Sequence, residues 1–215
     1  MGRVTKRIID PSRPGSLAAR TRERRWRMFE ECFPNVSEMS VLDLGGTADA
    51  WRLIPIRPAR LVFLNVRAPG ELSGAEIIMG DACNPPDRVW RERFDIVFSN
   101  SLIEHLGGHS RRQTFAEVVR SLADHHWVQT PYRYFPVEPH YAGPLFQFLP
   151  LGARARLVAR WPIGSLATVK DPAECLAQAQ GTELLSRTEM RGYFPDAMLL
   201  TERVLGMTKS LIAFR

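Results

Sequence analysis

The chain of 215 residues lacks the features that define several protein classes. Its three cysteines, Cys32, Cys83 and Cys175, are widely spaced and form no Cys-x-x-Cys pair. They argue against a disulfide framework and against a structural zinc site. Apolar runs such as Leu61–Leu64 are far shorter than the roughly 18–20 residues of a membrane span. Because no apolar leader segment is present near the N-terminus, we expect a cytoplasmic protein without a membrane span.

The excess positive charge is confined to the first part of the chain. Residues 1–27 carry nine basic and two acidic side chains, whereas residues 28–215 carry 20 basic and 21 acidic ones. A nucleic-acid groove built into the fold would not leave the rest of the chain neutral, so nucleic acid is not the expected partner. We divide the chain into a basic N-terminal arm or helix, 1–30, and one domain, 31–215. Residues 1–27 of this arm are expected to be dispensable for folding.

Short apolar segments alternate with helical ones along the domain. Buried strands are predicted at Ser40–Leu44, Arg60–Val66, Ala75–Met79, Phe94–Ser99 and His126–Gln129, with a terminal pair at Ala197–Val204 and Ser210–Phe214. Helices are predicted near 16–32, 48–53, 110–122, 151–160 and 182–193. This order predicts an α/β fold with a Rossmann-like, seven-stranded, mostly parallel sheet, helices on both faces and an antiparallel last strand. The aromatic segment 131–170 is expected to form a lid-like insertion that binds the acceptor.

Polar and glycine residues follow the ends of the predicted strands. In chain order they are VLDLGGT at 41–47, Asn65, Gly80-Asp81-Ala82, and SNSLIEH at 99–105. A glycine turn directly after a strand lets a ligand approach the backbone, and the next helix offers free N–H groups to it. A polar side chain about 20 residues further on suits ribose hydroxyls.

These motifs and the terminal strand pair resemble the class I S-adenosylmethionine-dependent methyltransferases of the small-molecule type. The resemblance covers roughly residues 40–130 and 195–215, and it implies S-adenosyl-L-methionine as the cofactor. It also implies a cofactor site formed by Asp43, Gly45, Gly46, Thr47, Asn65, Asp81, Ala82, Ser99 and Asn100. The loop departs from the common G-x-G-x-G pattern after its first glycine. Asn65 replaces the usual acidic residue, so its ribose contact would lack charge assistance.

Two glutamate–histidine pairs are the candidate catalytic residues. Glu104 and His105 follow the fourth strand, and Glu138 and His140 lie in a Glu-Pro-His stretch that resembles the same family. Methyl transfer to a hydroxyl needs an in-line approach and removal of a proton, which suits a histidine near neutral pH. His140 is favoured as the base, and His105 is the alternative. The pairs could also share a divalent ion of the Mg²⁺ type, whose ligands the sequence leaves unknown.

The sequence therefore predicts O-methylation of a hydroxyl on a small acceptor, such as a sugar or another metabolite. Two alternatives remain open at this stage. One is methylation of RNA or of a lipid-linked acceptor guided by the basic arm. The other is a methyltransferase-like subunit that binds without catalysis. The sequence leaves the oligomeric state open, a homodimer included.

Overall fold

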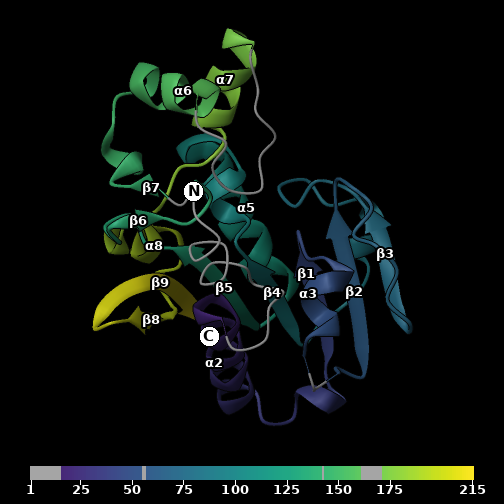
Figure 1. The fold of residues 1–215 in the computed structure, drawn as a ribbon. Helices are drawn as coiled ribbons and strands as arrows, with labels where there is room; N and C mark the ends of the chain where they lie inside the picture. Colours follow the sequence, from purple (N-terminus) through teal and green to yellow (C-terminus); the bar gives the residue numbers. More distant parts are fainter. Residues whose placement is uncertain (1–15, 55–56, 142, 161–170) are drawn as a thin grey trace.

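The computed structural model describes residues 16–54, 57–141, 143–160 and 171–215. A single seven-stranded sheet runs through the centre, in the order β3-β2-β1-β4-β5-β9-β8 (Figure 1). Its strands are β1 Ser40–Leu44, β2 Arg60–Asn65, β3 Ala75–Met79, β4 Ile96–Asn100, β5 His125–Pro131, β8 Met198–Val204 and β9 Met207–Phe214. Strand β9 is antiparallel to both of its neighbours, and the other six strands share one direction. The predicted Rossmann-like α/β sheet with an antiparallel last strand is confirmed.

Alternation along the strands divides the core between the two faces of the sheet. Leu42 and Leu44 of β1 pack on one face, whereas Val41 packs on the other. The first face is covered by α4 Asp87–Trp90, α5 Gly108–Leu122 and α8 Arg187–Tyr193. The second face is covered by α2 Leu17–Cys32 and α3 Ala48–Arg52. Because consecutive side chains of a strand point to opposite faces, both layers are anchored on the same strands.

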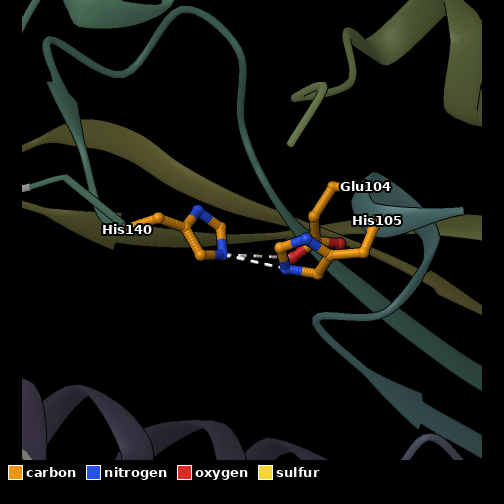
Figure 2. A group of neighbouring side chains, drawn as sticks. All are labelled: Glu104, His105 and His140. Atoms are coloured by element: carbon orange, nitrogen blue, oxygen red, sulfur yellow. Dashed lines mark hydrogen bonds and ion pairs between the residues drawn. The ribbon is translucent and has the colours of Figure 1, made fainter. Parts of the chain in front are cut away.

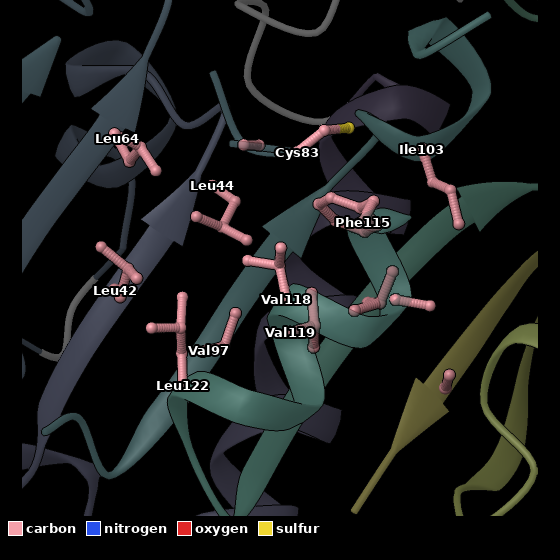
Figure 3. Packing of buried hydrophobic residues seen from close by; sticks show 14 of the residues in the cluster. Leu42, Leu44, Leu64, Cys83, Val97, Ile103, Phe115, Val118, Val119 and Leu122 are labelled. Atoms are coloured by element: carbon pink, nitrogen blue, oxygen red, sulfur yellow. The ribbon is translucent and has the colours of Figure 1, made fainter. Parts of the chain in front are cut away.

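Helix α5 shows why its sequence forms a sheet-covering helix. Phe115, Val118, Val119 and Leu122 recur at spacings of three and four, which places them on one side of the helix. Figure 3 shows these side chains packed against the apolar side chains of the central strands, such as Val97 of β4. Helix α8 packs into this layer through Met190 and Tyr193. It begins with a capping box, in which the side chains of Ser186 and Glu189 accept from each other's backbone N–H groups.

The basic helix α2 is part of the core rather than a peripheral arm. Trp26 and Phe29 are 6% and 2% exposed, and the Trp26 ring stacks on Phe98 of β4 with centroids 5.2 Å apart. Both side chains also lie beside Trp51 or Trp127 in the same cluster. This packing disagrees with the expectation of a dispensable arm, since the aromatic side chains bury in the core while Arg20, Arg24 and Arg27 are exposed. Residues 1–15 lie outside the described part of the chain.

The segment after β5 forms a small unit of its own. It contains β6 Val137–Glu138, β7 Gly143–Pro144, a 3-10 turn at Phe146–Phe148, α6 Leu151–Arg160 and α7 Pro172–Gln180. Two further 3-10 turns, Val36–Glu38 and Ile103–His105, lie outside this unit, before β1 and after β4. A separate apolar cluster holds the unit together, made of Tyr141, Phe146, Ala155, Val158, Cys175 and Ala179. Helix α7 was not predicted from the sequence, and the helix predicted at 182–193 begins only at Arg187. Residues 161–170 of the predicted insertion lie outside the described part.

Within the described ranges, no helix combines the length and the apolar character that crossing a membrane requires.

Candidate active site

The predicted motifs meet at one edge of the sheet. Strands β1, β2, β4 and β5 are parallel, so their carboxyl ends lie side by side. Leu44 of β1 pairs with Leu64 of β2, and Asn100 of β4 pairs with Gln129 of β5. Ligands of open α/β sheets bind at this edge, where the loops after the strands converge.

The turn after β1 can only be built with glycine. Gly45 has a φ of +79°, a conformation that L side chains rarely adopt, and its N–H donates to the carbonyl of Leu64 at 2.9 Å. A Cβ on Gly46 would lie 1.8 Å from Oδ2 of Asp43. The turn therefore presents bare backbone at the sheet edge and rests directly on the Asp43 carboxyl group.

Asp43 is enclosed beneath this turn. It is 1% exposed, and its Oδ2 accepts a hydrogen bond from Nε1 of Trp51 at 2.6 Å. Its Oδ1 has no hydrogen-bond partner among the described residues. Burial raises the pKa of Asp43 to about 7, and the bond from Trp51 only partly opposes this shift. Asp43 thus supports the turn and leaves one acceptor atom unused.

Asn65 ties the second strand to the same turn. Its Nδ2 donates to the carbonyl of Gly46 at 3.0 Å, and its Oδ1 accepts from the N–H of Arg67 at 3.2 Å. Both bonds are internal, so ribose binding by Asn65 stays a prediction. Thr47 is exposed at the N-cap of α3, where its side chain makes no capping hydrogen bond.

Asp81 lies after β3 in an ion pair that the sequence analysis missed. Nη2 of Arg111 donates to both of its carboxylate oxygens, at 3.0 and 2.8 Å, and the N–H of Cys83 donates to Oδ1 at 2.9 Å. Burial alone would raise the pKa of Asp81, but these bonds outweigh it and hold the pKa below its usual value. Ala82 beside it is buried. The carboxylate is therefore charged at neutral pH and is held in a defined orientation.

Ser99 and Asn100 end β4 on opposite faces of the sheet. Ser99 is buried, and its hydroxyl donates to the carbonyl of Leu44 at 3.0 Å. Oδ1 of Asn100 accepts from Nη1 of Arg25 at 2.8 Å, and Nη2 of Arg25 pairs with the buried Glu202 at 2.9 Å. Helix α2 therefore reaches this edge. Nothing in the arginine-rich segment distinguishes Arg25 from its neighbours, so the sequence carried no signal for this contact.

The four predicted catalytic side chains converge at the same edge of the sheet. Glu104 lies in the 3-10 turn after β4 and is 0% exposed. Its Oε2 accepts from the hydroxyl of Thr130 on β5 at 2.9 Å, whereas its Oε1 has no hydrogen-bond partner among the described residues. Figure 2 shows that this free oxygen points toward His140, whose Nε2 lies 4.0 Å away.

His140 is oriented by a second buried carboxylate. Its Nδ1–H donates to Oε1 of Glu138 at 2.7 Å, and Oε2 of Glu138 accepts from the N–H of Tyr141 at 2.6 Å. Burial lowers the pKa of His140, but the bond to Glu138 and the charges of Glu138 and Glu104 outweigh burial and raise it above its usual value. Burial raises the pKa of Glu104, and the two histidines partly oppose that shift.

His105 completes the group from the opposite side. Its Nδ1–H donates to the carbonyl of Gly181 at 2.9 Å, with the hydroxyl of Thr182 at 3.4 Å from the same nitrogen. Its Nε2 lies 3.2 Å from Nε2 of His140. The sequence analysis placed these histidines at one edge but did not find the contacts from Thr130 and Gly181 that orient the group.

Comparisons with known proteins agree on the fold. No protein-family model matches the chain, and no curated protein matches it in sequence. Among solved structures, magnesium protoporphyrin IX methyltransferase from Synechocystis PCC 6803 with bound S-adenosylhomocysteine is 11% identical, with a TM-score of 0.55 over 100% of this chain and 88% of that one. The N-methyltransferase NodS from Bradyrhizobium japonicum WM9 is 12% identical, with a TM-score of 0.54 over 91% of this chain and 96% of that one.

A third structure, the CurJ carbon methyltransferase, is 11% identical with a TM-score of 0.57 over 96% of this chain. This chain spans only 57% of the CurJ chain. The three neighbours are described as methyltransferases that differ in the acceptor atom or compound, and all share the architecture described above. The chain therefore has the fold of the class I S-adenosylmethionine-dependent methyltransferases.

Proposed function

We propose that this protein transfers a methyl group from S-adenosylmethionine to a hydroxyl of a small acceptor, such as a sugar or another metabolite. The observation that carries the proposal is the convergence of Glu104, His105, Glu138 and His140 at the carboxyl edge of the sheet. An alcohol must lose its proton as the new C–O bond forms, and this group of side chains is suited to accept one.

The residues at the glycine turn fit the methyl donor. The cofactor supplies a methyl carbon that its sulfonium has already activated for nucleophilic attack. The bare backbone at Gly45 and Gly46 admits a ligand close to the turn, and Oδ1 of Asp43 is an unused acceptor beneath it. In this proposal the turn and Thr47 hold the amino-acid end. Asn65 binds the ribose, Asp81 and Ala82 flank the adenine, and Ser99 and Asn100 form the wall near the sulfur.

His140 acts as the base through its Nε2. Glu138 holds the Nδ1 proton, so the tautomer that leaves Nε2 free is the stable one. When Nε2 accepts the proton of the acceptor hydroxyl, the imidazolium formed lies between two buried carboxylates, Glu138 and Glu104. Their charges stabilise it.

The insertion supplies a surface for a ring-shaped acceptor. Tyr134 and Phe148 are exposed and stack with centroids 6.0 Å apart, and Tyr132 lies 5.5 Å from Tyr134. These rings lie on the same stretch of chain as His140, between β5 and α6. Exposed aromatic rings bind the apolar faces of sugars and of flat metabolites.

The test combines calorimetry of cofactor binding with transfer of a labelled methyl group into a metabolite extract. His140→Ala is expected to bind the cofactor like the parent and to lower turnover by roughly 100-fold or more. His125→Ala, an exposed histidine at the opposite end of β5, is the matched control. A parent protein that binds no cofactor, or a His140→Ala variant that turns over like the parent, would overturn the proposal.

A further inference from the structure

The donor atoms of the Glu–His group do not suit magnesium, the ion that the sequence analysis considered. Oε1 of Glu104, Nε2 of His105 and Nε2 of His140 all lie within 4.8 Å of one another. Two of these three atoms are imidazole nitrogens. Mg²⁺ prefers six oxygen ligands and keeps several waters, whereas imidazole suits zinc and its transition-metal neighbours.

The hydrogen bonds of the two histidines fix which nitrogens are free. The carbonyl of Gly181 can only accept, so Nδ1 of His105 carries a proton. The carboxylate of Glu138 imposes the same tautomer on His140. In both neutral rings the unprotonated Nε2 atoms therefore face each other at 3.2 Å (Figure 2). Two lone pairs at this distance repel unless a proton, as in an imidazolium, or a metal ion lies between them.

The third donor faces the same point from the interior. Glu104 is completely buried, Thr130 holds its Oε2, and its Oε1 is left without a partner. A buried, unpartnered carboxylate oxygen carries a large desolvation cost, which a bound cation removes. His105 is exposed, so the group is open to solvent on one side.

From this arrangement we infer that Glu104, His105 and His140 bind a zinc-type divalent transition-metal ion, with a fourth position open toward the acceptor. Two histidines and one glutamate with an open position are a ligand set of catalytic zinc sites. Ligands roughly 2.0–2.2 Å from such an ion lie about 3.4 Å apart, close to the distance between the two Nε2 atoms. Oε1 of Glu104 lies 4.0 Å from Nε2 of His140 and within 4.8 Å of Nε2 of His105, so it needs to move by at most about 1.4 Å to reach the same ion.

Glu138 and Gly181 complete the site without touching the ion. Metal-binding histidines usually donate their other N–H to a carboxylate or a carbonyl, which fixes the ring and strengthens the ligand. Here Glu138 does this for His140 and Gly181 for His105. In the protein with the ion bound, His140 is a ligand and does not act as the base. The ion would instead lower the pKa of a bound acceptor hydroxyl. The base role of His140 therefore belongs to the metal-free protein. This consequence rests on the proposed function, whereas metal binding itself does not.

The experiment measures metal binding without cofactor or acceptor. Untagged full-length protein is stripped with a chelator and titrated with ZnCl₂ against a chromophoric competitor, and Co²⁺ is used to record the absorption bands of a tetrahedral site. The parent is expected to bind one Zn²⁺ per chain, with excess Mg²⁺ unable to displace it. His105→Ala, whose side chain is exposed, and His140→Ala should lose this binding. Glu138→Gln should weaken it by roughly 10–100-fold, and His125→Ala should match the parent.

Two results would overturn the inference: a parent that binds no Zn²⁺, and a His105→Ala variant that binds it as the parent does. Displacement of Zn²⁺ by Mg²⁺ at similar concentration would also overturn it. The outcomes for the two proposals are separable. A protein that binds zinc but transfers no methyl group contradicts only the proposed function. A parent that transfers a methyl group but binds no Zn²⁺ contradicts only the inference.

Discussion

At the scale of single residues, the buried carboxyl groups decide how this protein responds to pH. The pKa of Asp43 is raised from 3.8 to about 7 in the folded state. The folded protein therefore binds a proton that the unfolded chain releases above about pH 4. This contribution to stability is present below that pH and is lost as the pH rises toward 7. The loss amounts to roughly 4 kcal/mol at most.

Asp43→Asn is expected to remove this pH dependence, because its carbonyl can still accept from Trp51 and no charge is buried. The free energy of unfolding of the variant should exceed that of the parent at pH 8, and the gain should shrink at pH 5. Denaturant titrations at the two pH values measure this. The exposed Asp49→Asn is the control and should change neither value. An equal effect of Asp43→Asn at both pH values would contradict the assignment.

Asp81 allows a direct test of the cofactor site. Asp81→Ala removes the proposed acceptor of the adenine amine and should weaken S-adenosylmethionine binding by roughly 1–3 kcal/mol in calorimetry. Arg111→Ala separates this role from the ion pair, because it keeps the carboxylate and removes only its internal partner. Binding unchanged in Asp81→Ala would place the adenine elsewhere.

At the scale of elements, helix α2 joins the core to the site through one buried ion pair. Arg25 bonds Asn100 and Glu202, and the side chain of Glu202 is 0% exposed. Arg25→Ala removes the guanidinium that hydrogen-bonds the buried Glu202, which keeps only electrostatic contact with Lys209, and should lower the free energy of unfolding by roughly 3–5 kcal/mol. The double variant Arg25→Met/Glu202→Gln should recover most of that loss.

Arg27→Ala, two residues further along the same helix, is the matched control. Because Arg27 is exposed, this change should lower the free energy of unfolding only slightly. If Arg25→Ala unfolds at the same denaturant concentration as Arg27→Ala, the contact with Glu202 does not support the helix.

Trp26→Ala probes the apolar side of the same helix. A loss of roughly 3–5 kcal/mol in the free energy of unfolding is expected, because the ring stacks on Phe98.

At the scale of the whole molecule, the two core layers share one sheet and should unfold together. Three of the five tryptophans, Trp26, Trp51 and Trp127, are buried on one face, so fluorescence reports largely on that face, and circular dichroism reports on all helices and strands. Coincident denaturant transitions are expected from the two probes.

A chain of residues 31–215 lacks Trp26 and Phe29 and should show no cooperative transition. Cooperative folding of that fragment would support the division of the chain at residue 30.

Much of the fold could be predicted from the sequence because its signals are local. Apolar runs of five or six residues indicated β1, β2 and β3 with nearly correct ends, and glycine and proline marked the turns. Parallel strands bring their carboxyl ends to one edge, so the strand order also placed the glycine turn and the Glu–His pairs together. Asp171 at the N-cap and Pro172 at the first position are local signals for the start of helix α7, but the helix was missed because it buries only two small side chains, Cys175 and Ala179.

The succession of strands and helices along the chain, the presence of helices on both faces of the sheet and the types of residue at the site were determined by the sequence alone. Only the tertiary structure decided which side chains meet. Arg25 is 177 residues from Glu202, and His105 is 35 residues from His140. Periodicity assigns a side chain to a face of its own helix or strand. Its partner depends on how the faces of distant elements pack, because that packing sets the distances between donors, acceptors and lone pairs.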